Sequence, residues 1–142
     1  MFGGGGSIQL ARVFGIRIGV TTSWFLVLFF FIFVLSGSFR DTLDSSDTVA
    51  YLTAVASALL FFGSLLAHEF GHALTARRLG IETTGIDLWF FGGVAKMERD
   101  ADSPGTEFKI AAAGPLVSLI VVVACVGAGI ALAGQAEFWD AV

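Results

Sequence analysis

Residues 64–78 read SLLAHEFGHALTARR, and this stretch decides how the rest of the chain is interpreted. It ends an apolar run that begins at Val49, and it places His68, Glu69 and His72 close to two arginines. On a helix, positions i and i+4 lie on the same face, so both imidazoles can reach one metal ion. Glu69 projects from the helix about a quarter turn away. The spacing His-Glu-x-x-His is typical of a zinc hydrolase.

The apolar setting of this motif strengthens the prediction of a metal site. An ionisable side chain near the middle of a bilayer costs about 2.5–3.5 kcal/mol on insertion scales, so these polar residues need a compensating partner. The chain contains only two histidines, and both belong to the motif. We therefore predict that His68 and His72 are metal ligands.

The composition is that of a membrane protein. The chain has 142 residues, of which 56% are hydrophobic, and it contains fifteen Phe but only two Pro. These values predict a polytopic membrane protein with a single membrane-embedded domain over residues 1–142, in contact with the lipid bilayer. The net charge of -4, without a clustered basic run, argues against a nucleic-acid partner. The sequence leaves open whether copies of the chain form a homo-oligomer.

We predict an all-α fold with three transmembrane helices plus a small membrane-associated β-hairpin between the second and third helices. The apolar segments place the helices at about residues 18–36, 49–76 and 110–133. Two β-prone runs around the turn signal Gly92-Gly93 predict the hairpin at about residues 83–98. Its aromatic end is too apolar for a free loop, so we expect it to dip into the membrane. An interfacial aromatic anchor without a catalytic role is the alternative.

The basic residues predict the orientation of the helices. With the amino terminus in the cytoplasm, seven of the eight basic residues lie inside and only Arg40 lies outside. The metal motif then lies toward the cytoplasmic side. A signal peptide is the alternative for the first apolar segment, because small residues follow it. Its length, and Trp24 as a predicted interfacial anchor, favour a membrane span.

Two imidazoles do not complete a catalytic zinc site, which takes three protein ligands and keeps a fourth position for water. The third ligand must therefore come from elsewhere. Zinc lowers the pKa of a bound water toward about 7, and Glu69 is the natural general base to take its proton. We predict peptide hydrolysis, in which the activated water attacks a peptide carbonyl and Glu69 returns the proton to the leaving amine.

Several short motifs along the chain point to one family. They are Phe14-Gly15-Ile16, Ser23-Trp24-Phe25, His68-Glu69-Phe70-Gly71-His72, Phe91-Gly92-Gly93 and Ala113-Gly114-Pro115. In these motifs the chain resembles the site-2 protease family of intramembrane zinc metalloproteases, in its prokaryotic branch with a Phe-Gly-Gly hairpin. The resemblance implies an integral protein of the bacterial inner membrane.

The resemblance also implies roles for particular residues. His68 and His72 would bind one Zn²⁺, and Glu69 would activate water. Six further residues would contact the substrate: Phe91, Gly92, Gly93, Gly114, Pro115 and Ser118, the last at a position where many relatives have Asn. The family's third ligand is an Asp on a later helix, so we expect it beyond Val142. The 142 residues are then the N-terminal part of the protease core, and we expect them to bind zinc weakly and to hydrolyse nothing alone.

The implied substrate is the transmembrane segment of a membrane-anchored protein, cut in regulated intramembrane proteolysis. Two alternatives belong to other classes of function. One is a non-catalytic metal-binding or regulatory membrane protein. The other is an ion or proton relay subunit, in which the same three polar residues carry protons across the membrane.

Overall fold

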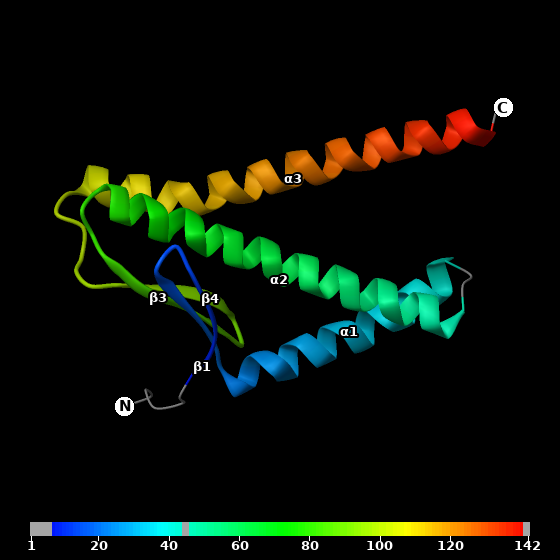
Figure 1. The fold of residues 1–142 in the computed structure, drawn as a ribbon, viewed down its shortest axis with the longest axis horizontal. Helices are drawn as coiled ribbons and strands as arrows, with labels where there is room; N and C mark the ends of the chain where they lie inside the picture. The colour runs from blue at the N-terminus through cyan, green and yellow to red at the C-terminus, as the bar shows by residue number, and fades with distance from the viewer. Residues whose placement is uncertain (1–6, 44–45, 141–142) are drawn as a thin grey trace.

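The computed structural model describes residues 7–43 and 46–140, which form three helices and one four-stranded sheet (Figure 1). The helices are α1 (Thr22–Leu43), α2 (Asp47–Arg78) and α3 (Pro104–Asp140). The strands are β1 (Ile8–Val13), β2 (Ile16–Val20), β3 (Thr83–Trp89) and β4 (Gly92–Met97). All three helices are long and apolar enough to cross a membrane. The predicted three candidate membrane helices are therefore confirmed.

Helix α2 is the centre of the molecule. Its 32 residues correspond to a length of about 48 Å. Helix α1 and the sheet lie on one side of α2, whereas α3 lies on the other side (Figure 1). In the first half of α2, Ala54 and Ala58 are fully buried against Ile32 of α1, because small side chains let the two helices approach closely.

A Schellman motif ends α2 and directs the chain into the sheet. Gly80 has a positive φ of 79° and donates its backbone N–H to the carbonyl of Arg77. Ile81 donates to the carbonyl of Ala76 at 2.9 Å, and its side chain packs on the same alanine. This is the bond pattern of an αL helix end. It turns the chain back, so that β3 runs along the second half of α2.

The sheet has the strand order β1-β2-β3-β4, with β2 and β3 parallel and the other neighbours antiparallel. One face of the sheet packs on α2. Ile86 of β3 lies in a buried cluster with Ala73 of α2, and Leu88 lies in another with Phe62. Ile86 and Leu88 are two positions apart, so their side chains point to the same face of the sheet. This is the face that packs against the second half of α2.

The N-terminal region differs from the prediction of an all-α fold with a single hairpin. Residues 8–20 form a second hairpin, and α1 begins at Thr22 and not near residue 18. Ile16, Ile18 and Val20 occupy every second position of β2 and are all buried, as expected for a strand with one face on a core. Trp24, predicted as an interfacial anchor, is only 8% exposed and packs in the core beside Phe62.

The hairpin between α2 and α3 occupies the expected part of the chain, but its turn differs from the prediction. Phe90 and Phe91 form the turn, whereas Gly92 and Gly93 are the first residues of β4, opposite Trp89 and Leu88. Gly93 lies against Glu69 of α2 at a place where a side chain would not fit, so this glycine allows β4 to pack on the helix and does not form the turn.

Candidate metal centre

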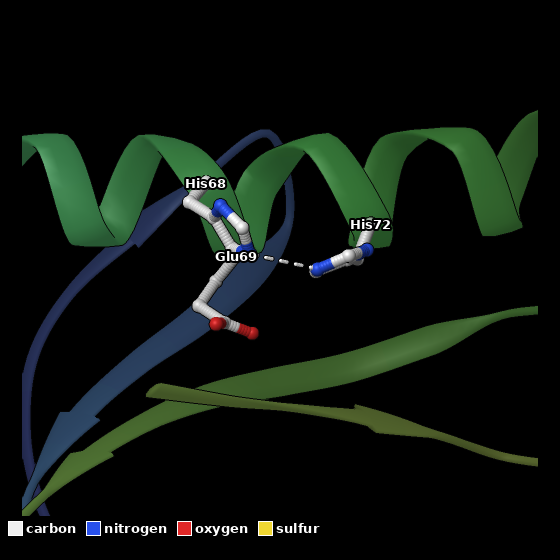
Figure 2. Close-up of side chains that lie close together, drawn as sticks. All are labelled: His68, Glu69 and His72. Carbon is white, nitrogen blue, oxygen red and sulfur yellow. Dashed lines mark hydrogen bonds between the residues drawn. The ribbon is translucent and has the colours of Figure 1, made fainter. Parts of the chain in front are cut away.

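His68, Glu69 and His72 lie together in the second half of α2. The two imidazoles point toward one another, and their Nε2 atoms are 3.1 Å apart (Figure 2). One ligand atom from each of the three side chains lies within 4.8 Å of the others. The histidines are half-buried, and Glu69 is 9% exposed. The helix therefore brings together the three residues that its spacing predicts.

The outer nitrogens of both rings contact α3. His72 Nδ1 lies 2.7 Å from the backbone carbonyl of Ile110, and His68 Nδ1 lies 2.8 Å from the hydroxyl of Ser118. A carbonyl oxygen can only accept a hydrogen bond, so Nδ1 of His72 is the donor, and in the neutral ring this leaves the lone pair on Nε2. Metal-binding histidines in proteins are commonly held in this way through the other ring nitrogen.

The spacing of the two Nε2 atoms fits a zinc ion. Two nitrogens that each lie about 2.0–2.1 Å from one tetrahedral zinc are roughly 3.3 Å apart. The observed separation of 3.1 Å is close to this value. Among the residues whose side chains the structure describes, 7–42 and 46–133, no other Cys, Asp or Glu belongs to the group around the two histidines. The described residues thus offer two imidazole ligands and an adjacent carboxylate.

Two glycines let α3 approach the imidazoles. A Cβ atom added at Gly114 would overlap His72 Nε2 and would lie 2.7 Å from His68 Nε2. On the facing helix, a Cβ atom at Gly71 would lie 2.7 Å from the carbonyl oxygen of Ala113. Real Cβ atoms essentially never come this close to another heavy atom, so neither position has room for a side chain. The crossing of α2 and α3 at these glycines creates the space in front of the Nε2 atoms.

The sheet contacts the site through β4. A Cβ atom at Gly93 would overlap Glu69 Cγ and would lie 3.0 Å from its Cδ. The side chain of Glu69 extends from α2 toward the strands (Figure 2). Within the described residues β4 is an edge strand of the sheet, and its Gly93 lies against this carboxylate.

The other predicted substrate contacts lie on the elements around this centre. Phe91 is 79% exposed in the hairpin turn, and Gly92 begins β4 with a φ of 137°. Pro115 follows Gly114 within α3 and is exposed. Ser118 contacts His68 directly. The sequence reasoning missed the carbonyl of Ile110, and no sequence signal could reveal it, since every residue has such a carbonyl.

Asp87 of β3 belongs to a separate charged group on the sheet. Its carboxylate lies 2.5 Å from Lys96 Nζ and 4.0 Å from the guanidinium of Arg17. Burial alone would raise the pKa of Asp87. Hydrogen bonds from Lys96 and Ser7, with the charges of Lys96 and Arg17, outweigh burial and hold this pKa below its usual value of 3.8.

Two imidazoles and a carboxylate, spaced as His-Glu-x-x-His on a helix long enough to span a membrane, form the metal-binding motif that is typical of zinc hydrolases. The model of Peptidase family M50 matches residues 56–140. The chain belongs to this family, which is that of the site-2 proteases.

Individual relatives agree with this assignment. The chain is 37% identical over 115 residues to a provisionally named zinc metalloprotease of Synechocystis sp., covering 81% of this chain and 30% of the relative. It is 32% identical over 134 residues to the zinc metalloprotease MJ0392 of Methanocaldococcus jannaschii, covering 94% of this chain and 34% of the relative. The solved site-2 protease from Methanocaldococcus jannaschii superposes with a TM-score of 0.56 and 31% identity, covering 83% of this chain and 49% of that chain. The chain thus spans about a third of the length of the two zinc metalloproteases and about half of the solved chain.

Proposed function

We propose that this chain is part of an intramembrane zinc endopeptidase that cleaves transmembrane segments of membrane-anchored proteins. The observation that carries the proposal is the pair of Nε2 atoms at 3.1 Å beside the buried carboxylate of Glu69. His68 and His72 would hold the zinc ion. When bound, zinc supplies Lewis acidity, which lowers the pKa of a water molecule and polarises a peptide carbonyl.

Glu69 would act as the general base and then as the general acid. Its carboxylate takes a proton from the attacking water and returns it to the nitrogen of the leaving amine. The carboxylate lies on the α2 face that meets β4, so a peptide held along that strand would approach it from the sheet side. Removal of a general base typically lowers the rate by about 10²–10⁴-fold.

The edge of β4 would bind the substrate as an added strand. A helical segment hides its peptide bonds, so it must unwind before hydrolysis, and strand addition would hold the extended form. We propose that Phe91, Gly92 and Gly93 contact the substrate from the hairpin, and that Gly114 and Pro115 contact it from α3. The proximity of Gly93 to Glu69 supports this arrangement.

The depth of the site supports cleavage within the membrane. His72 contacts Ile110, the first residue of the apolar part of α3 after Lys109. His72 lies five residues before Arg77 on α2, which is about 8 Å along the helix axis. We propose that these basic residues mark the cytoplasmic surface of a bacterial inner membrane. The metal would then lie below that surface but within reach of water from the cytoplasm.

A complete catalytic site needs a third protein ligand. Among the described residues only Glu69 accompanies the two histidines, and we assign it to proton transfer. We therefore propose that a part of the whole protein outside these 142 residues supplies the third ligand. Accordingly, we expect the 142 residues alone to bind zinc weakly and to show no hydrolysis.

Substitution of Glu69 tests the proposal. In the whole protein, reconstituted in liposomes with a single-span membrane substrate, Glu69→Gln should lower proteolysis by about 10²–10⁴-fold while zinc content stays unchanged. Glu107→Gln, in the exposed first turn of α3, is the matched control and should keep full activity. Undiminished proteolysis in Glu69→Gln would refute the assignment of the general base. If the wild type shows no proteolysis but conducts protons across the liposome membrane, and Glu69→Gln does not conduct them, the results favour a relay subunit.

A further inference from the structure

We propose that Ser118 is a positioning residue for His68, and that its hydroxyl presents Nε2 of this ring to the metal. The inference rests on the proposed zinc site. It gives Ser118 a different role from the substrate contact that the family resemblance implies.

One stripe of α3 holds both imidazoles. Ile110, Gly114 and Ser118 are spaced by four residues, so they lie on the same face of the helix. The carbonyl of Ile110 accepts from His72 Nδ1, and Gly114 leaves space for both Nε2 atoms. Ser118 completes the stripe through its contact of 2.8 Å with His68 Nδ1. Each ring is therefore fixed at the nitrogen that does not face the other ring.

The two contacts differ in chemistry. The carbonyl of Ile110 can only accept, so it allows a single tautomer of neutral His72. The hydroxyl of Ser118 can donate or accept, so it can bind His68 Nδ1 with or without a proton on that nitrogen. When His68 Nε2 binds a metal, Nδ1 carries the proton of the neutral ring and donates a hydrogen bond to the hydroxyl of Ser118. The side chain at position 118 thus orients one of the two ligands.

The position of Ser118 also argues against a direct substrate contact. Its hydroxyl already bonds to the outer nitrogen of His68, whereas Nε2 faces His72. A group that bonds to the outer nitrogen acts on the metal through the orientation of the ring. We therefore expect its loss to change metal affinity before it changes substrate binding.

Zinc affinity measured against a chromophoric chelator tests this role. The whole protein in detergent is the sample, so that the complete ligand set is present. Ser118→Ala should weaken zinc binding by about 10–100-fold, as is typical when the hydrogen-bond partner of a metal ligand is lost. Ser118→Thr keeps the hydroxyl and should retain most of the affinity. Ser64→Ala is the matched control. Ser64 lies one turn before His68 on α2, and its hydroxyl donates to the backbone carbonyl of Phe61 and not to a histidine.

A second readout reports on the ring itself. Nitrogen-15 NMR of the zinc-loaded wild type should show His68 protonated at Nδ1, and Ser118→Ala should alter that signal while the His72 signal stays unchanged. Wild-type zinc affinity in Ser118→Ala, with a raised KM for substrate, would overturn the inference and restore a substrate contact. Equal loss of affinity in Ser64→Ala would overturn it as well. A wild type that binds no zinc contradicts the proposed function itself, and this is measured before any variant is made.

Discussion

At the scale of single residues, the proposed metal centre depends on glycines as much as on its two proposed ligands. Gly114 and Gly93 face the motif from two different elements, and both lie where a Cβ atom would overlap a motif side chain. A histidine can bind a metal only when its nitrogen is accessible, so the missing side chain at position 114 is as necessary as the imidazole it faces.

Gly114→Ala should remove the metal site. The added methyl group would overlap His72 Nε2, and the ring cannot move away without breaking its bond to Ile110. We expect zinc affinity to fall by at least about tenfold, measured by elemental analysis after dialysis against a weak chelator. Gly127→Ala on the same helix is the control, since nothing lies within 4 Å of its added methyl group. Stoichiometric zinc in Gly114→Ala would show that the imidazoles bind metal in another arrangement.

The sequence was sufficient to predict part of this centre. The spacing of His68 and His72 is a local property of one helix, so it predicts their proximity without any knowledge of the fold. The contacts of Ile110 and Ser118 depend on the register at which α3 crosses α2. That register is fixed by the close approach at Gly71 and Gly114, and a single sequence does not reveal it.

At the scale of the elements, α1 and the sheet share one side of α2. Helix α1 packs against the first half of α2, and the sheet packs against the second half. Helix α1 begins at the level of Phe62, where Trp24 packs, and the sheet covers α2 from there to its end. The sequence predicted the hairpin of β3 and β4 because two β-prone runs lie on either side of Gly92-Gly93, a turn signal. The hairpin of β1 and β2 was missed because its second strand leads directly into the apolar segment of α1, so both read as one span.

The charged group of Asp87 should stabilise the sheet in a pH-dependent way. Because its pKa is lowered in the folded protein, its contribution is complete above the usual value of 3.8 and is lost as the pH falls through the folded pKa. Asp87→Asn should cost about 1 kcal/mol at pH 7, a small value because Lys96 is half exposed and screened by solvent.

Thermal unfolding in detergent, followed by tryptophan fluorescence, measures this cost. The difference between wild type and Asp87→Asn should stay constant from pH 7 to 5 and shrink toward pH 3. Asp102→Asn is the control, because Asp102 forms only an exposed ion pair with Arg99. A difference that grows on acidification would contradict the sign of the pKa shift.

The turn of the β3–β4 hairpin should reach into the hydrocarbon region of the bilayer. Leu88 packs with Phe62, which precedes His72 on α2 by ten residues, or about 15 Å on the side away from Arg77. Trp89, 41% exposed next to this turn, reports its depth. Lipids brominated near the middle of their chains should quench more fluorescence in wild type than in Trp89→Phe. If brominated lipids quench wild type and Trp89→Phe equally, and aqueous iodide quenches the fluorescence of Trp89, the hairpin is an interfacial anchor.

At the scale of the whole molecule, the ends of the helices decide which side of the membrane serves the metal site. An ion pair of 2.9 Å between Arg40 and Asp47 joins the end of α1 to the start of α2, far along α2 from the histidines. The sheet, the end of α2 and the start of α3 gather at the opposite end (Figure 1). That end carries seven of the eight basic residues. The positive-inside tendency therefore predicts that it faces the cytoplasm.

Cysteine labelling on intact cells tests this orientation. In a Cys125→Ser background, Asp41→Cys at the end of α1 should react with an impermeant maleimide, whereas Ser103→Cys before α3 should react only after permeabilisation. Arg40 alone on the outer side cannot offset the basic residues at the other end, so the inverted topology is disfavoured. Labelling of Ser103→Cys in intact cells would place the metal site toward the outside. Water would then enter from the exterior, and the cleaved product could not be released to the cytoplasm.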